Sequence, residues 1–472
     1  MSEATGHNAK YYIHSIITII ITFGVGFLNP VGSITPLGMD ILGIFLGMLY
    51  GWIFVGMTDY TTIQGAFQSG IGHNNTLLVI VALLFGYYLD KSQLSRTIAY
   101  KIISMKISIG RPWIFTMLYF LAAYIIGAVV NHFACIVLLW SIFYQICDVL
   151  KIEKKTTWAS YVIIGVAFIA ILGSYALPIK ETPLFLRGIM EPTLGMSIPF
   201  VQWMLWFNIM HLLAVVVYLF IGKFILRPDV TAVKNAGDFM SQYRHIKLPR
   251  EQHLPLILLL IFISALIFPS FMPETWRITA ILSQLGLVGI GTLLIIFLMI
   301  IRSKEGVPYA DYTELFTGAM NWNLIWLMAA TMPICAAMES DATGIISWLT
   351  TMLLPIVQNL SPTMFIIVIT VVFCAISQVA HNMILMIVMI PLLETLAIAN
   401  GSNPIVIALL FNYGVALAMI TPGASAQAAM YHGNTDWVST KQAYGISTIT
   451  VIFQLVIGLI IGIPLANILF PW

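Results

Sequence analysis

Long apolar runs alternate with short polar stretches along this chain. Runs of the length of membrane-spanning helices cover residues 12–29, 37–57, 203–223, 254–270, 279–301 and 445–469. A helix of about 20 predominantly apolar residues crosses the hydrocarbon core of a bilayer, so each run predicts one transmembrane helix. The pattern therefore predicts an all-α polytopic membrane protein, with helices packed in lipid.

Three features of the sequence occur twice, in the same order and about 250 residues apart. The pairs are Asp59-Tyr60-Thr61 with Asp311-Tyr312-Thr313, Asn131-His132 with His381-Asn382, and the stretch from Gly165 with the stretch from Gly414. We interpret the chain as two repeats of one unit. In membrane proteins, paired repeats place a site between them that can face either side, which is typical of transporters.

Composition supports the membrane assignment and excludes other partners. The chain is 60% hydrophobic and 8% charged, whereas a soluble domain of this length carries roughly a quarter charged residues. The formal net charge is +2 and no basic run is present, so no nucleic-acid partner is expected. The four cysteines lie in apolar stretches without a metal-binding spacing, which favours buried small hydrophobes.

The basic residues predict how the chain is oriented. Residues 224–253 form the most polar long stretch, and the positive-inside rule places this linker in the cytoplasm. The linker separates a first repeat, 1–223, from a second, 254–472. We expect each repeat to cross the membrane five times. Because this number is odd, the second repeat is inverted relative to the first, and both termini lie outside. The lipid bilayer of the cell inner (plasma) membrane is the expected location.

Each repeat is expected to hold a re-entrant hairpin and an interrupted transmembrane helix. The first repeat has them at 113–147 and 157–199, and the second at 362–398 and 404–440. Polar residues, glycine and proline break the apolar pattern at the centre of all four. Such breaks free backbone groups and present the positive ends of half-helices, which suits a small anion. At each break, an interhelical hydrogen bond or a helix kink is the alternative interpretation.

These residues resemble the divalent-anion:sodium symporter family of the ion-transporter superfamily, nearest to the bacterial citrate/succinate and tartrate antiporter-like members. The resemblance covers residues 37–469. Family members carry Ser-Asn-Thr at each hairpin tip and Thr-Pro in the second interrupted helix. By position these fall on Val130-Asn131-His132, Ala380-His381-Asn382 and Thr421-Pro422. The resemblance implies a homodimer that moves its substrate by an elevator-like shift of a transport domain.

The breaks and the resemblance together define a candidate site. Substrate contacts are expected from Asn131, His132, Ser174, His381, Asn382, Thr421 and Pro422. Candidates for holding a coupling ion or for supplying a tethered cation are Gly173, Lys180, Gly423 and Ser425. A sodium ion, where one is bound, is expected near Asn131 and Asn382. No cofactor is expected.

The first tip departs from the family signature in a way that bears on coupling. Val130 and His132 replace the Ser and Thr whose hydroxyls suit sodium, so we hypothesise that sodium coupling is weakened or absent. Protons carried by His132 and His381 are one substitute, and an ammonium supplied by Lys180 is another. In the alternative interpretation, Lys180 pairs with Glu181 or extends to the membrane interface.

The sequence therefore predicts a secondary active transporter of a small organic anion, foremost a di- or tricarboxylate, that works by exchange or cation coupling. A proton-coupled carrier of another small anion or of an amino-acid-like substrate is the alternative. An intramembrane enzyme would need a nucleophile or metal set that the spans do not show, so no enzyme is expected. A passive channel would usually lack two inverted, broken-helix repeats.

Overall fold

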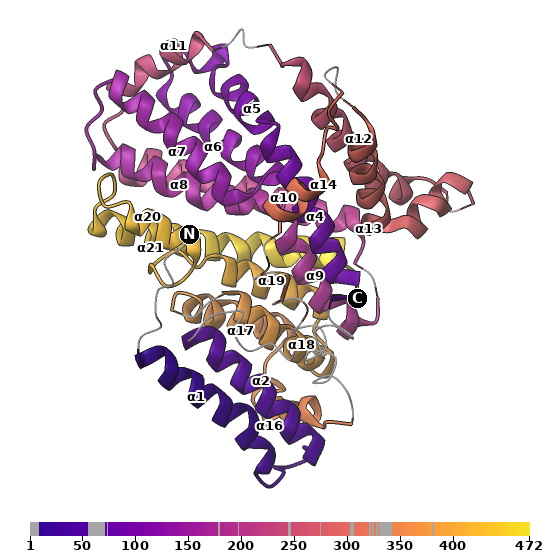
Figure 1. Ribbon diagram of the computed structural model, residues 1–472. Coiled ribbons are helices and arrows are strands. Elements are labelled where there is room, and N and C mark those ends of the chain that lie inside the picture. Colours follow the sequence, from indigo (N-terminus) through magenta and orange to yellow (C-terminus); the bar gives the residue numbers. More distant parts are fainter. Residues whose placement is uncertain are drawn as a thin grey trace.

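The computed structural model describes most of the chain. The described residues are 9–54, 71–72, 74–177, 180–196, 198–243, 247–273, 275–302, 306–320, 322, 325–326, 329, 342–379 and 382–472. Within these ranges every regular element is a helix, which confirms the predicted all-α class (Figure 1). The expected span 37–57 lies partly outside the described residues.

The first half of the chain forms ten helices within the described ranges. In chain order they are α1 Ala9–Gly24, α2 Pro36–Phe54, α4 Asn74–Lys91, α5 Leu94–Ile103, α6 Pro112–Val129, α7 His132–Val149, α8 Thr157–Ser174, α9 Glu181–Leu194, α10 Phe200–Phe220 and, in the linker, α11 Ala236–Ser241. The helices α6 and α7 lie where the first hairpin is expected. The helices α8 and α9 lie where the first interrupted helix is expected.

The second half repeats this order of long and broken helices. Its described helices are α12 His253–Phe271, α13 Arg277–Ile300, α14 Tyr312–Gly318, α16 Ile345–Val357, α17 Pro362–Ile376, α18 Asn382–Asn400, α19 Pro404–Ala416, α20 Ala426–Gly433, α21 Thr440–Ile457 and α22 Ile463–Leu469. The helices α17 and α18 lie where the second hairpin is expected, and α19 and α20 lie where the second interrupted helix is expected. That the halves are inverted relative to each other stays a prediction.

Six helices are long and apolar enough to cross a membrane, counted over the described residues. Both arms of the first hairpin, α6 and α7, are among them, because each has 18 residues and so reaches about 27 Å. The predicted re-entrant path of this hairpin is therefore not settled by helix length. In the second half, α13 bends by 89° where Gly286 adopts a positive φ of 56°. The sequence analysis expected one uninterrupted span over 279–301.

The hairpin helices pack on the interrupted helix of their own half. In the first half α6 and α7 both contact α8, and in the second half α17 and α18 both contact α19. Apolar helices gain no hydrophobic driving force against each other in lipid, so close backbone approach must supply the contact. Glycine supplies it here, because a Cβ on Gly127 would collide with the Ala170 backbone and one on Gly173 with Tyr124.

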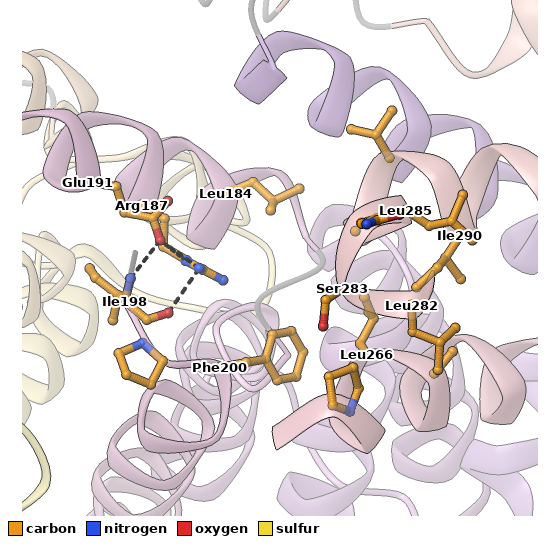
Figure 2. A pocket seen from close by; sticks show the side chains of 16 residues that line it. Leu184, Arg187, Glu191, Ile198, Phe200, Leu266, Leu282, Ser283, Leu285 and Ile290 are labelled. Carbon is orange, nitrogen blue, oxygen red and sulfur yellow. Dashed lines mark hydrogen bonds and ion pairs between the residues drawn. The ribbon is translucent and has the colours of Figure 1, made fainter. Parts of the chain in front are cut away.

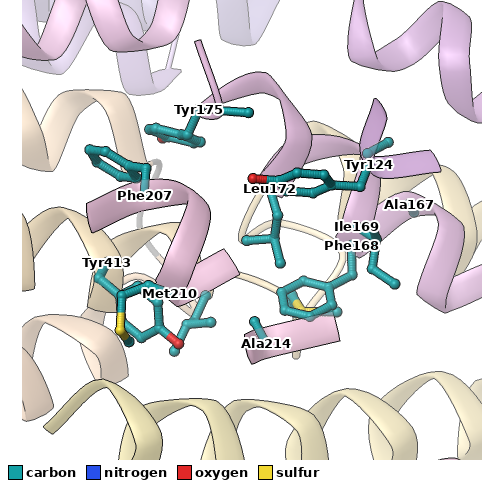
Figure 3. Close-up of a cluster of buried hydrophobic side chains, with 14 of the residues drawn as sticks. Tyr124, Ala167, Phe168, Ile169, Leu172, Tyr175, Phe207, Met210, Ala214 and Tyr413 are labelled. Atoms are coloured by element: carbon teal, nitrogen blue, oxygen red, sulfur yellow. The ribbon is translucent and has the colours of Figure 1, made fainter. Parts of the chain in front are cut away.

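The two halves also contact each other through their interrupted helices. The first part of the first one, α8, packs against α20 and α21, and the second part, α9, packs against α18 and α19. Aromatic side chains fill the region where α8 ends, beside α10 and α19 (Figure 3). There Tyr175 stacks on Phe207 with ring centroids 5.3 Å apart. These contacts bring the broken ends of helices from both halves into one core.

Candidate functional site

The tip of the first hairpin is a two-residue connection between α6 and α7. The Asn131 side chain caps α7, since its Oδ1 accepts from the backbone N–H of Phe133 at 2.9 Å and of Ala134 at 3.4 Å. Asparagine is a preferred helix cap for this reason. His132 follows as a buried side chain whose ring centroid lies 4.1 Å from that of Phe133. Both predicted site residues therefore lie at this tip.

Lys180 connects the tip of the first hairpin to the first interrupted helix. Its Nζ donates to the Val130 carbonyl oxygen at 2.7 Å, and only 7% of the residue is exposed. A buried ammonium group is costly in a membrane unless polar groups surround it. The amine is buried and held by the tip, so it does not extend to the membrane interface. The side chain of Glu181, the other expected partner, lies outside the described residues.

The carbonyls that the first break releases are held by side chains of α10. Asn208 Nδ2 donates to the Ala176 carbonyl at 2.8 Å, and its Oδ1 accepts from the Tyr124 hydroxyl at 2.9 Å. His211 Nδ1 lies 2.9 Å from the Leu172 carbonyl oxygen. The sequence analysis did not single out these α10 residues. The available signal was that Asn208 and His211 are polar and lie about one helical turn apart in the apolar run 203–223.

Two candidates at the first break take part in helix packing. The Ser174 hydroxyl is buried and donates to the Ile171 carbonyl of its own helix at 2.7 Å. Gly173 permits the close approach of α8 to α6 at Tyr124. Neither residue therefore presents a polar side-chain group toward the gap between α8 and α9.

Gln378, in the turn after α17, bonds the backbone of the second break at several points. Its Oε1 accepts from the N–H of Met419 at 3.1 Å and of Ile420 at 3.0 Å, and its Nε2 donates to the Leu417 carbonyl at 3.1 Å. The Thr421 hydroxyl returns a bond to the Gln378 carbonyl. The second hairpin and the second interrupted helix are thus joined at their centres.

The remaining backbone of the second break is bonded by α20. Ser425 caps that helix by accepting from the Ala428 N–H at 3.2 Å, and its hydroxyl donates to the Ala418 carbonyl at 2.7 Å. Tyr431 bonds the Met419 carbonyl. Pro422 and Gly423, between these anchored residues, are exposed. They form the part of the predicted site that remains accessible.

The signature expected at the second tip, Ala380-His381-Asn382, falls largely outside the described residues and stays a prediction. Between the end of α17 at Ile376 and the start of α18 at Asn382, Ser377 and Gln378 form the turn that meets the break. His381, and the side chain of Asn382, lie outside the described residues. A hydroxyl followed by an amide is what the family signature also places at a tip, which is the signal that could have identified Gln378.

The structure brings the candidates together in two groups. Asn131, His132 and Lys180 meet at the first tip, and Thr421, Pro422, Gly423 and Ser425 lie beside Gln378 at the second. The groups are linked by the packing of α9 on α18 and of α20 on α8. No cluster of three His, Cys, Asp or Glu side chains suited to a metal occurs among the described residues.

A separate cavity of about 550 Å³ lies between α9 and the start of α10 on one side and α12 and α13 on the other. Arg187 and Glu191 form an ion pair of 2.6 Å in its wall, and Arg187 also bonds the Ile198 carbonyl at 3.0 Å (Figure 2). The opposite wall includes Ser283 and Leu285 beside the bend of α13. None of the predicted site residues lines this cavity.

Broken helices, polar tips and an apolar all-helical fold define a secondary transporter of the membrane. The family model described as "Citrate transporter" matches residues 31–411. The chain belongs to this family and is a multi-pass plasma-membrane transporter, not an enzyme. This confirms the resemblance to divalent-anion symporters that the hairpin and break residues indicated.

A curated relative and two solved structures are similar to the chain. The sodium-dependent dicarboxylate transporter SdcS of Staphylococcus saprophyticus is 20% identical over 261 residues, which is 54% of this chain and about half, 49%, of that relative. The YdaH transporter of Alcanivorax borkumensis has a TM-score of 0.56 at 12% identity, with 98% of each chain covered. MtrF of Neisseria gonorrhoeae, from a class of antimetabolite efflux pumps, gives 0.56 at 12% over 96% and 94%. The two structures support the fold.

Proposed function

We propose that this chain exchanges small organic anions, foremost di- or tricarboxylates, across the membrane without a coupling sodium ion. The observation that carries the proposal is the buried Lys180 ammonium on the Val130 carbonyl of the first tip. A carbonyl oxygen at a hairpin tip is a ligand that a sodium ion would use. Here the protein supplies its own cation to that oxygen.

The choice of an anion follows from the groups that meet at the breaks. The helices α7, α9 and α20 begin directly after Asn131, Lys180 and Ser425, so their positive ends lie at the first tip and at the two breaks. Lys180 adds a full positive charge to the first of these breaks. A carboxylate is the small anion best matched to backbone N–H groups and one ammonium. A substrate with two or three carboxylates can engage both groups of site residues.

Exchange is favoured over symport because a tethered cation cannot leave with the substrate. A carrier whose site keeps a fixed positive charge has a costly empty state in lipid, since that charge then lacks its anion. Return of the empty site is therefore disfavoured, and return with a second anion is favoured. We extend the proposal to an elevator-like movement of the two hairpins and interrupted helices within a homodimer, as the family resemblance implies.

A binding screen tests the proposed substrate class. Thermal unfolding of the purified protein in detergent would be followed with mono-, di- and tricarboxylates in sodium and in potassium buffers. We expect a dicarboxylate or tricarboxylate, but no monocarboxylate, to raise the midpoint by the same amount in both cations. If all carboxylates raised the midpoint equally, or if no carboxylate raised it, the proposed substrate class would be wrong. Stabilisation only in the sodium buffer would contradict the proposed mechanism without a coupling sodium ion.

A proton-coupled carrier is the second candidate function. The observation that favours it is the buried His132 imidazole at the first tip, because histidine changes charge near neutral pH. Such a carrier would accumulate its substrate when a proton gradient is the only driving force. An exchanger would instead require anion on the opposite side of the membrane.

A further inference from the structure

Gln378 uses its whole amide group to tie two elements together. Besides the two N–H bonds from the break and its bond to Leu417, its Nε2 donates to the Cys374 carbonyl at 2.8 Å and reaches the Ser377 hydroxyl at 3.2 Å. The residue is 8% exposed. Three of the bonds run from this turn after α17 to Leu417, Met419 and Ile420, which are about 40 positions away in sequence.

The partners fix the orientation of this amide. The two groups at Oε1 are backbone N–H donors, so an acceptor must face them. Two of the groups at Nε2 are carbonyl oxygens, so a donor must face them. Reversing the amide would oppose donor to donor and acceptor to acceptor. Glutamine is therefore the side chain that matches all four backbone groups at once.

The two tips satisfy their acceptor oxygens in the same way. In the first half an ammonium hydrogen of Lys180 reaches the Val130 carbonyl, and in the second half the amide hydrogens of Gln378 reach the Leu417 and Cys374 carbonyls. Such oxygens, released at a helix break, are the ones that otherwise need water or a cation. In both halves a protein N–H group occupies that place.

We propose that Gln378 is a positioning residue that holds the second interrupted helix open and bound to the second hairpin, in place of a coupling cation. The proposal deepens the exchange mechanism and rests on it. It means that each half has its own internal donor, a lysine in the first and a glutamine in the second. The break would keep the geometry that the substrate needs without an ion to bind and release.

Gln378→Glu tests this because it exchanges the donor half of the side chain for an oxygen. The deprotonated carboxylate would face the Leu417 and Cys374 carbonyls with no hydrogen, whereas the protonated acid restores one donor and one acceptor. We expect carboxylate exchange at pH 8 to be at least tenfold below that of the unmodified protein and to recover as the pH falls to 5. Gln378→Met, which has neither group, should stay low at every pH.

The comparison must separate Gln378 from other titrating groups. Titratable side chains on α17 to α20 are Cys374, Glu394, Tyr413, Tyr431 and His432. The helices α8, α9 and α21, which pack on these, add Tyr161, Glu181, Arg187, Glu191, Lys441 and Tyr444. The variant and the unmodified protein share these groups. The exchange rate of the variant is therefore divided by that of the unmodified protein at the same pH. Gln358→Glu, at an exposed position after α16, is the matched control for an added carboxylate. It should follow the unmodified protein throughout.

A substrate-independent measurement accompanies the transport assay. The thermal midpoint of Gln378→Glu should lie below that of the unmodified protein at pH 8 and approach it at pH 5. If the unmodified protein exchanges no carboxylate, the proposed function is wrong. The thermal midpoints still test the role of Gln378, because they do not depend on a substrate. A Gln378→Glu variant that matches the unmodified protein, or one that matches Gln378→Met, at all pH values in both assays would overturn the proposal.

Discussion

The Nζ of Lys180 lies 2.7 Å from the carbonyl oxygen of Val130, which joins the start of α9 to the tip of the first hairpin. The bond connects the two elements that the sequence analysis expected to form one half of the site. Because the residue is buried, the ammonium is not a surface charge that water would screen. In the proposed mechanism this ammonium takes the place that a sodium ion would have at the tip.

Lys180→Met should slow sodium-independent exchange. The variant keeps the length of the side chain but removes a charged hydrogen bond, which contributes about 1.5–3 kcal/mol. That corresponds to a loss of about tenfold or more in exchange rate measured with radiolabelled substrate. Sodium should partly restore the rate, because the Val130 carbonyl is then open to a cation. Lys223→Met, at an exposed position near the end of α10, is the control and should be unaffected.

The prediction for Lys180 has a clear opposite. Exchange by Lys180→Met at the unmodified rate, in the absence of sodium, would mean that the ammonium serves only to stabilise the fold. If the variant reaches the membrane but shows no exchange in either sodium or potassium, the tethered charge is essential. The predicted rescue by sodium would then be wrong.

Asn208→Leu should lower the stability of the folded protein, because Asn208 holds the backbone at the first break. The change removes the amide that bonds the Ala176 carbonyl and the Tyr124 hydroxyl, and the loss is expected to be about 1–2 kcal/mol. Thermal unfolding in detergent would show a lower midpoint. Asn467→Leu is the matched control, since Asn467 bonds the Ile463 carbonyl of its own helix at 3.0 Å. Equal midpoints for the two variants would contradict the support that we assign to Asn208.

Gly173→Ala should be destabilising although alanine favours helices. A Cβ at this position would overlap the Tyr124 backbone and force α8 away from α6, at a cost of about 1–3 kcal/mol. Gly445→Ala, where no atom lies within 4 Å of the added Cβ, should be neutral or stabilising by up to about 1 kcal/mol. The pair would be compared by thermal unfolding. A Gly173→Ala protein as stable as Gly445→Ala would argue against the close helix contact.

The helices could be predicted from the sequence because their signals are local. The predicted breaks at Asn131 and Ser174 lie where helices begin or end, and the one at Thr421 lies in the gap between α19 and α20. The bend of α13 at Gly286 was not predicted, since a single glycine in an apolar run is equally typical of close packing. Lys180 was a candidate because a charged residue within an apolar stretch has few structural explanations.

The side chains that complete the site could not be predicted, because their partners are distant in sequence. Gln378 bonds residues about 40 positions away, and Asn208 bonds Ala176 across 32. Such pairs depend on which faces α10 and α17 turn toward the breaks, and a uniformly apolar helix leaves its faces undetermined. The part that Gln378 plays at the second tip could not be predicted for a related reason. The polar residues of this tip, from Ser377 to Asn382, offer more than one register for the signature.

Exchange in the absence of sodium is the most direct test of the account. Proteoliposomes would be loaded with an unlabelled di- or tricarboxylate in potassium buffer, and entry of the labelled anion would be measured with and without external sodium. We predict that entry requires the internal anion, is equally fast in both buffers, and does not respond to a pH gradient alone. Entry that requires sodium, or that proceeds into empty vesicles when sodium is added, would contradict the account.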